Sequence, residues 1–262
     1  MRLWLAILLL VLPVDAWSES VRFPSVTVGS SSAGPELSGW LYRPSGAGPF
    51  PAIVLAHPCN GVSQHTDSWG KLMVNWGYIV LAPDSFGPRG QKTVCGRGIV
   101  VTGNARVADI AGAIEYLNAQ PFVQGANIGL IGHSHGGWTV MRAVQKEAGL
   151  AARGLRAAVA YYPFCQPQFD TNVAVPLVIL IGDKDDWTSA DNCRRLQKAG
   201  FARPELVEAV YYPNAYHSFD AKAADRTLMV ADGKSHRLAY DPVGGPDAEA
   251  RTKAFFAKYL RP

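Results

Sequence analysis

Apolar and polar residues follow two different patterns along the chain. In residues 21–28 and 37–42 they alternate, which is typical of antiparallel strands with one exposed face. From residue 51 onward, short runs that are wholly apolar take over, and each is typical of a strand buried on both faces. These runs cover residues 52–56, 78–82, 128–131, 157–161 and 177–181, and a weaker one covers residues 207–212.

Segments with a helical spacing of apolar residues separate these runs. They cover residues 67–76, 105–118, 137–147, 190–198 and 247–260. Strands and helices that alternate in this way predict an α/β fold with a mostly parallel, doubly wound sheet flanked by helices. Because ligands bind beyond the carboxyl ends of the strands in such sheets, the residues that follow each apolar run are the candidates for function.

Length and charge narrow the class of protein. The 262 residues, 48% of them hydrophobic and 18% charged, suffice for the core of one catalytic domain over residues 17–262. The net charge of +4 is spread without a run of Lys and Arg, which argues against nucleic acid as a dedicated partner. The oligomeric state stays open.

Residues 1–16 have the features of a signal peptide. Met1 and Arg2 precede an apolar run over residues 3–14, and Ala16 offers a small residue at a cleavage point. The run is shorter than the ~20 residues that a membrane-spanning helix needs. The sequence therefore predicts a secreted or periplasmic protein that has no membrane span after cleavage.

The cysteines form no CxxC pair, and no His and Cys cluster has the spacing of a zinc site. In an exported protein this pattern predicts disulfides and no metal site. The four cysteines are Cys59, Cys95, Cys165 and Cys193.

The most specific motif is Gly132-His-Ser-His-Gly-Gly137, which lies between an apolar run and a helical segment. It matches the G-x-S-x-G nucleophile elbow, in which a strained turn lifts the serine hydroxyl above the sheet at a helix N-terminus. Glycines on both sides of the serine let strand and helix approach closely. Ser134 is therefore the expected nucleophile.

A serine hydroxyl needs a base to remove its proton, and with this elbow the acid and then the histidine follow the serine in chain order. His217 comes shortly after the last apolar run and is the expected base. The other histidines precede or flank Ser134 or, like His236, follow no strand. The competing interpretation of His217 is a surface loop residue.

Several aspartates compete to orient this histidine. The run at residues 177–181 leads into a turn, and the third residue after its glycine, the usual position of the acid, is Asp185. Asp186 is the alternative, Asp183 is expected to cap the turn, and Asp170 is a more distant candidate.

Acyl transfer also requires N–H donors where the oxyanion forms. The residue after the nucleophile, His135, offers one backbone donor, and the loop after the third strand offers the other. Cys59 is the expected second donor, with Asn60 as the alternative. Cys59 can be a half-cystine at the same time, because the donor is its backbone N–H.

Together these motifs give the chain, from about Val21 onward, a resemblance to the dienelactone hydrolase family of α/β-hydrolases. The segments that carry it are residues 57–61, 83–90, 182–187 and 212–220, with the elbow at Ser134. The resemblance implies the α/β-hydrolase fold and a small-molecule ester or lactone as substrate, without a cofactor. The chain departs from the family's best-known members, which are cytoplasmic and use a cysteine nucleophile.

The strand order of that fold implies a disulfide pairing. The third strand lies beside the fourth and the sixth near the seventh, which favours Cys59–Cys95 and Cys165–Cys193. The other two connectivities would join loops that lie further apart.

Few segments are left to enclose a substrate. Only residues 163–174 separate the sixth and seventh strands, so no lid domain is expected, and an open site suits small or accessible esters. Residues 221–245 could wall the pocket or form a solvated connector. Trp138 and Trp187 are candidates for the pocket rim or for the core.

Arg89 follows the fourth strand, from where its guanidinium could bind a substrate carboxylate. The competing interpretation is a surface arginine that pairs with a nearby aspartate. Arg106 and Asp109, about one helical turn apart, are expected to pair with each other.

The predicted function is hydrolysis of carboxylic esters or lactones through Ser134, His217 and Asp185, by way of an acyl-enzyme. Acyl transfer to an alcohol, peptidase activity and a non-catalytic binding protein are the alternatives. The complete set of three side chains argues against the binding protein.

Overall fold

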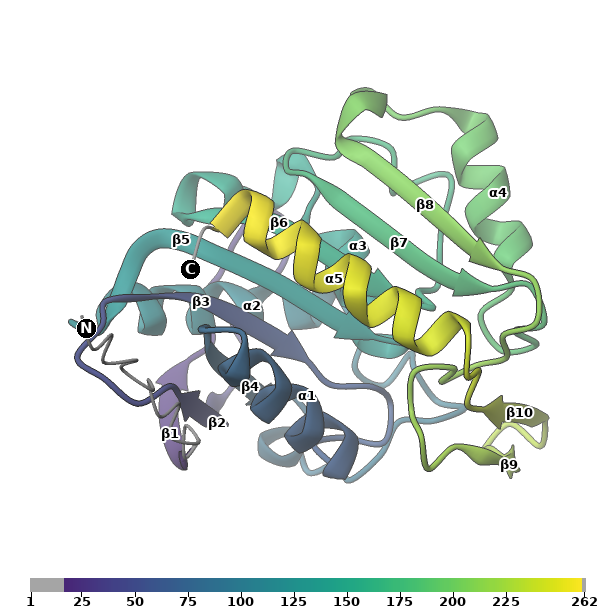
Figure 1. Ribbon diagram of the computed structural model, residues 1–262, viewed down its shortest axis with the longest axis horizontal. Coiled ribbons are helices and arrows are strands. Elements are labelled where there is room, and N and C mark those ends of the chain that lie inside the picture. The colour runs from purple at the N-terminus through teal and green to yellow at the C-terminus, as the bar shows by residue number, and fades with distance from the viewer. Residues whose placement is uncertain (1–16, 261–262) are drawn as a thin grey trace, which may run out of the picture.

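The short apolar runs form the centre of an eight-stranded sheet in the computed structural model, which describes residues 17–260 (Figure 1). The strand order is β1-β2-β4-β3-β5-β6-β7-β8, and every neighbouring pair from β4 to β8 is parallel. The mostly parallel sheet predicted from the sequence is therefore confirmed. The parallel strands are β3 (Phe50–Ala56), β4 (Ile79–Asp84), β5 (Val123–His133), β6 (Leu155–Tyr161), β7 (Leu177–Gly182) and β8 (Val207–Tyr212).

The alternating segments near the N-terminus form the antiparallel edge of this sheet. Strand β1 (Trp17–Pro24) pairs with β2 (Glu36–Arg43), and β2 pairs with β4. Leu37 and Leu41 are buried while Glu36 and Trp40 are exposed. The period of two in the sequence thus reflects one buried and one exposed face.

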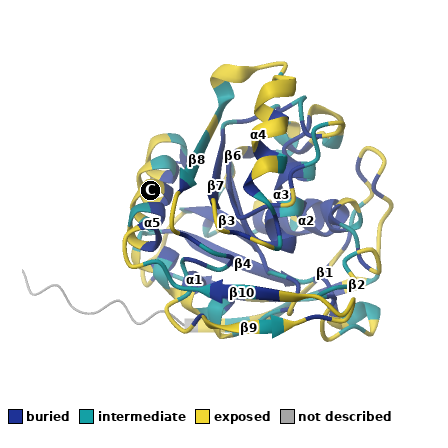
Figure 2. Ribbon diagram, turned by 90° about the vertical axis from the view of Figure 1, so that its right-hand side faces the viewer, coloured by how far each residue is buried: buried dark blue, intermediate teal, exposed yellow. Residues whose placement is uncertain are grey.

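Helices cover both faces of the sheet (Figure 1). Helices α1 (Gln64–Asn75) and α5 (Gly244–Leu260) lie on one face, and α2 (Gly103–Asn118) and α3 (His135–Ala143) lie on the other. Helix α4 (Ala190–Ala199) connects β7 to β8. The central strands are buried between these layers (Figure 2), which is why their sequences are wholly apolar. Short 3₁₀ turns occupy Gly87–Arg89, Lys146–Ala148, Leu150–Arg153 and Pro204–Leu206.

A hairpin that the sequence did not predict follows β8. Strands β9 (Asp225–Met229) and β10 (Ser235–Ala239) pair antiparallel within residues 221–245, which the sequence presented as a loop. The strands are five residues long and rich in charged residues, so they lack the apolar signal of a buried strand. Figure 1 shows the hairpin beyond the carboxyl ends of the parallel strands.

Strand β6 leads to β7 through residues 162–176, which contain no helix or named strand, so no lid domain is inserted there. Within residues 17–260, every helix is too short or too polar to cross a lipid bilayer. The predicted signal peptide, residues 1–16, lies outside the described residues.

Candidate active site

Ser134 occupies a strained turn between strand and helix. Strand β5 ends at His133, helix α3 begins at His135, and the serine between them has φ 55° and ψ −114°. A Cβ atom on Gly136 would lie 2.0 Å from the carbonyl oxygen of Ala56. The glycine is therefore needed for the close approach of α3 to β3, which holds the strained serine in place.

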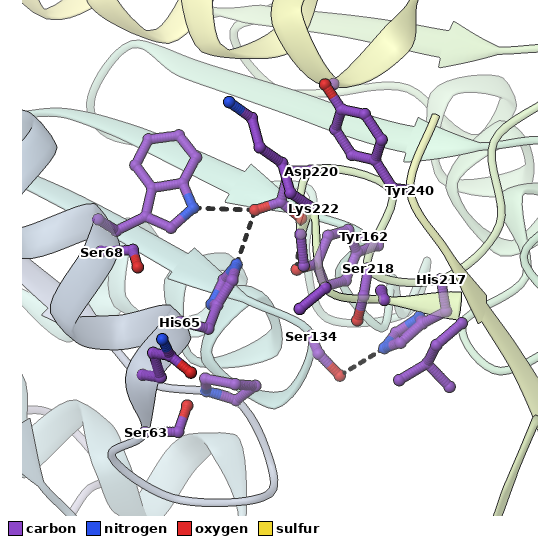
Figure 3. A pocket seen from close by; sticks show the side chains of 18 of the residues that line it. Ser63, His65, Ser68, Ser134, Tyr162, His217, Ser218, Asp220, Lys222 and Tyr240 are labelled. Atoms are coloured by element: carbon purple, nitrogen blue, oxygen red, sulfur yellow. Dashed lines mark hydrogen bonds and ion pairs between the residues drawn. The ribbon is translucent and has the colours of Figure 1, made fainter. Parts of the chain in front are cut away.

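The three side chains named from the sequence meet at this turn. His217 Nε2 lies 2.9 Å from Ser134 Oγ (Figure 3), and His217 Nδ1 lies 2.8 Å from Asp185 Oδ2. All three residues are buried. The ring of His217 packs between Tyr162 and Trp187, with centroid distances of 4.6 and 4.9 Å, so its orientation is set by packing as well as by hydrogen bonds.

Asp185 is held as an acceptor by its own turn. Its Oδ1 accepts the N–H groups of Trp187 and Thr188 at 2.9 and 2.8 Å. Its Oδ2 accepts the hydroxyl of Thr188 at 3.0 Å in addition to the contact with His217. These hydrogen bonds fix the orientation of the carboxylate toward His217.

The competing aspartates lie elsewhere. Asp186 is half-exposed and accepts the N–H of Arg237 in the hairpin. Asp183 pairs with Arg194 on the surface, and the buried Asp170 pairs with Arg142. The structure brings only Asp185 to His217 among these four.

The two N–H groups expected to bind an oxyanion come from the elbow and from the loop after β3. His135 begins α3, and Cys59 lies in the loop between β3 and α1. Among the hydrogen bonds found between turns and loops of residues 17–260, none uses either N–H as donor. Both groups therefore have the capacity to donate to a ligand.

Two disulfides lie at this end of the sheet, one between two loops and one between a loop and α4. They join Cys59 to Cys95 and Cys165 to Cys193, with Cα separations of 4.9 and 5.1 Å. This is the connectivity expected from the strand order. Disulfides of this kind are typical of an extracellular or periplasmic environment.

A cavity of about 960 Å³ opens beside Ser134 and His217. Residues in and next to α1 contribute polar side chains to its lining, among them Ser63, His65 and Ser68 (Figure 3). The hairpin contributes Leu228 and Leu238, so residues 221–245 wall the cavity rather than forming a solvated connector. A backbone hydrogen bond joins the hairpin to the segment of His217, because Ala239 donates its N–H to the carbonyl of His217 at 3.2 Å.

Of the two tryptophans expected at the pocket rim or in the core, only one lines the cavity. Trp187 lines the cavity and stacks on His236 at 4.7 Å. Trp138 does not line it, because its ring packs on His135 and Phe164.

Arg89 also lies outside the cavity lining in the described chain, because it is bound to an aspartate. Its guanidinium forms two hydrogen bonds of 2.8 Å with Asp109, which also accepts the hydroxyl of Ser25. The expected pair between Arg106 and Asp109 is therefore wrong. Arg106 instead donates to His57 and His135, because Asp109 already has a bidentate partner.

Asp220 organises a second cluster in the cavity, which the sequence analysis missed (Figure 3). Its Oδ2 accepts from Trp69 Nε1 at 2.9 Å and lies 2.8 Å from His65 Nε2, while its Oδ1 accepts the hydroxyl of Tyr162 at 2.8 Å. Burial alone would raise the pKa of Asp220, but the neighbouring His65 and His133 hold it below its usual range. The hydrogen bond to Asp220 thereby fixes the position of Tyr162, whose ring contacts His217.

The same cluster contains the one group in residues 17–260 with metal-ligand geometry. Potential ligand atoms of His65, His133 and Asp220 lie within 4.8 Å of one another. However, Trp69 and Tyr162 already donate to the Asp220 carboxylate. These hydrogen bonds identify Asp220 as the acceptor at the centre of a polar network.

Three buried histidines make stability depend on pH. Burial lowers the pKa of His133 and His135 to about 3 and that of His57 well below its usual value. As pH falls below about 6.5, the unfolded chain binds protons that the folded chain does not bind. For each of these histidines the free energy of unfolding should fall by about 0.7 kcal/mol per pH unit near pH 6.5 and by about 1.4 kcal/mol per pH unit near pH 5.

The prediction is tested by urea unfolding between pH 7 and pH 5, for the wild type and for His133→Leu. The substitution should reduce the dependence of the free energy of unfolding on pH by about one third of the part that the three histidines contribute. An unfolding free energy that does not change over this range would contradict it.

Comparisons with known proteins identify the family of this chain. A family model described as "Dienelactone hydrolase family" matches residues 37–260. A protein of Synechocystis sp. named "Putative carboxymethylenebutenolidase" is 22% identical over 222 residues, which cover 75% of this chain and 87% of the relative.

Solved structures share the fold. One from Klebsiella pneumoniae, named "Putative Dienelactone Hydrolase", is 20% identical with a TM-score of 0.70, and the match covers 93% of this chain and 100% of that one. Dipeptidyl peptidase 4 of Porphyromonas gingivalis is 17% identical with a TM-score of 0.64, over 93% of this chain and 36% of that one. The family match spans most of the chain, so the chain belongs to the dienelactone hydrolase family of the α/β-hydrolase superfamily.

Proposed function

We propose that the protein is a serine hydrolase that cleaves carboxylic esters or lactones through Ser134, His217 and Asp185. The observation that carries this proposal is the hydrogen-bonded series from Ser134 Oγ through the His217 ring to Asp185. In such a series the carboxylate fixes the histidine tautomer, so that Nε2 can accept the serine proton.

The reaction proceeds in two halves. Ser134 Oγ attacks the carbonyl carbon while its proton moves to His217 Nε2, and the C–O bond to the alcohol then breaks as His217 returns the proton to the alkoxide oxygen. Water next attacks the acyl-enzyme, giving one proton to His217, which passes it to Ser134 Oγ as the acid leaves. With a lactone, the alcohol and the acid remain parts of one product.

The N–H groups of Cys59 and His135 are the proposed donors to the tetrahedral oxyanion. Losing one such donor typically costs about 3–4 kcal/mol of transition-state stabilisation. The N-terminus of α3, where His135 lies, adds the positive end of a helix dipole.

The open cavity favours a small or accessible ester or lactone as substrate. It has a volume of about 960 Å³ and is walled by the β9–β10 hairpin without a lid domain. The relative named "Putative carboxymethylenebutenolidase" suggests a lactone as one substrate class. Export through a cleaved segment at residues 1–16 is part of the proposal, and the two disulfides support it.

A fluorophosphonate probe and a substrate panel test this function. The probe should label Ser134, and the protein should hydrolyse p-nitrophenyl acetate, with preferences established on esters, lactones and short peptides. Acyl transfer would show as an ester product in added alcohol. Labelling at another residue, or cleavage of peptides alone, would contradict the proposal.

The Cys59–Cys95 disulfide should affect turnover more than the other disulfide does. It tethers the loop that carries the proposed Cys59 donor, whereas Cys165–Cys193 lies after β6 and in α4. We expect the paired substitution Cys59→Ser and Cys95→Ser to lower kcat more than Cys165→Ser and Cys193→Ser. Each pair should cost about 3–4 kcal/mol of stability.

Ester hydrolysis and urea unfolding of both paired variants check this expectation. Equal losses of kcat in the two variants would show that the tether has no special effect on catalysis.

A further inference from the structure

Arg106 is a fully buried cation beside the elbow, and the proposed reaction does not use it. It lies in the first turn of α2, and its side chain has no exposed surface. Burial lowers its pKa to about 9, so the guanidinium remains charged at neutral pH. A charge buried in this way costs free energy unless strong hydrogen bonds compensate it.

The partners of Arg106 are neutral acceptors rather than a carboxylate. Its Nη1 donates to the carbonyl oxygen of His57 at 2.9 Å and to Nδ1 of His135 at 2.9 Å. The nearest aspartate in sequence, Asp109, is bound by Arg89. One nitrogen atom therefore bridges the loop after β3 and the start of α3.

These two segments carry the proposed oxyanion donors. The His57 carbonyl lies two residues before Cys59, and the His135 ring belongs to the residue whose own N–H is the other donor. The protonation state of His135 fits, because Nδ1 must be unprotonated to accept from a guanidinium, and burial next to Arg106 keeps its pKa at about 3.

Aromatic packing supports the same bridge. The Phe86 ring has edge contacts with His57 at 4.5 Å and with His135 at 5.6 Å, and the Arg106 guanidinium lies 5.1 Å from its centre. His57 is fixed further because its Nε2 accepts the N–H of Ser85 at 3.1 Å. The loop before Cys59 is thus held by Arg106 on one side and by the disulfide with Cys95 on the other.

We propose that Arg106 is a positioning residue that sets the separation of the two oxyanion donors, through the His57 carbonyl and the His135 ring. This rests on the proposed serine hydrolase function. Because the donors bind charge that develops only in the transition state, a shift in their separation should lower kcat while leaving KM nearly unchanged.

The test compares Arg106→Met and Arg106→Lys with the wild type and with Arg142→Met. Arg142 is a matched control, because its guanidinium is largely buried but lies at the far end of α3 from His135 and binds Asp170 and Gln166. Active sites are titrated with a fluorophosphonate, so that kcat refers to folded protein with a reactive Ser134.

We expect Arg106→Met to lower kcat per active site by about one to two orders of magnitude, which is less than the loss of a whole donor. Affinity for a trifluoromethyl ketone, whose adduct places an oxyanion at the same position, should fall by the same factor. Arg106→Lys should recover part of both, because it retains a donor. Unchanged kcat per active site, or an equal loss in Arg142→Met, would overturn the proposal.

A second pair of variants changes His135, whose Nδ1 accepts the hydrogen bond from Arg106. These variants test the proposal even if the Arg106 variants do not fold. His135→Gln keeps an acceptor for the guanidinium and His135→Leu removes it, so only His135→Leu should lower kcat per active site strongly. Equal activity of the two variants would overturn the bridge. If the wild type shows no turnover and no labelling at Ser134, the proposed function fails first, and the role of Arg106 fails with it.

Discussion

Ser134→Ala should reduce turnover of p-nitrophenyl acetate by about 10⁶-fold, because removing the nucleophile of a triad costs about as much as removing all three members. The fold should survive, since the alanine only deletes a hydroxyl that contacts His217. Ester hydrolysis and circular dichroism on the same preparation check both expectations.

The double variant Ser134→Ala and His217→Ala provides the control for a shared mechanism. It should be hardly slower than Ser134→Ala alone, because the two side chains act as a unit. Independent, multiplied losses would mean that another nucleophile supports the residual rate, and the assignment of Ser134 would then fail.

Asp185→Asn should lower kcat by about 10⁴-fold, because an amide can donate its N–H to His217 and favour the wrong tautomer. Its turn should remain intact, since Asn retains the oxygen that accepts the N–H groups of Trp187 and Thr188. Steady-state kinetics at neutral pH measure the loss.

The neighbouring carboxylate offers a matched control for Asp185. Asp186→Asn removes the same charge one residue away, where the side chain is half-exposed and bound to the hairpin. It should change kcat by a small factor only. A larger loss in Asp186→Asn than in Asp185→Asn would move the acid by one residue.

The three proposed catalytic side chains could be named from the sequence because each follows a strand with a clear signal. The apolar runs before Gly132, Gly182 and residue 213 are β5, β7 and β8, and the carboxyl ends of parallel strands meet at one edge of a sheet. Strand order alone therefore brings Ser134, Asp185 and His217 to the same place.

The Asp220 cluster could not be found in the same way. The partner His65 is 155 residues away in sequence, on a helix whose rotation about its axis is decided by packing. Residues 212–220, which include Asp220, carried part of the family resemblance, but an aspartate after a loop is also compatible with a solvated position.

The partners of the arginines show the same limit. Arg106 and Asp109 have the spacing of a helical ion pair, yet the pair does not form. Asp109 meets Arg89 because β4 and its following turn lie against α2, and a bidentate guanidinium outcompetes a neighbour on the same helix. The β9–β10 hairpin was also not predicted, because short strands that contain charged residues lack the apolar pattern by which a buried strand is recognised.

The sequence by itself determined the order of strands and helices, the elbow at Ser134 and the chain order of its partners, because these depend on local periodicity and on glycine positions. Only the tertiary structure decided which charged groups meet, which face of each helix is turned to the cavity, and how the hairpin encloses it. Those contacts join residues far apart in the chain, and a buried polar group can be satisfied by any suitable partner that packing brings within ~3 Å.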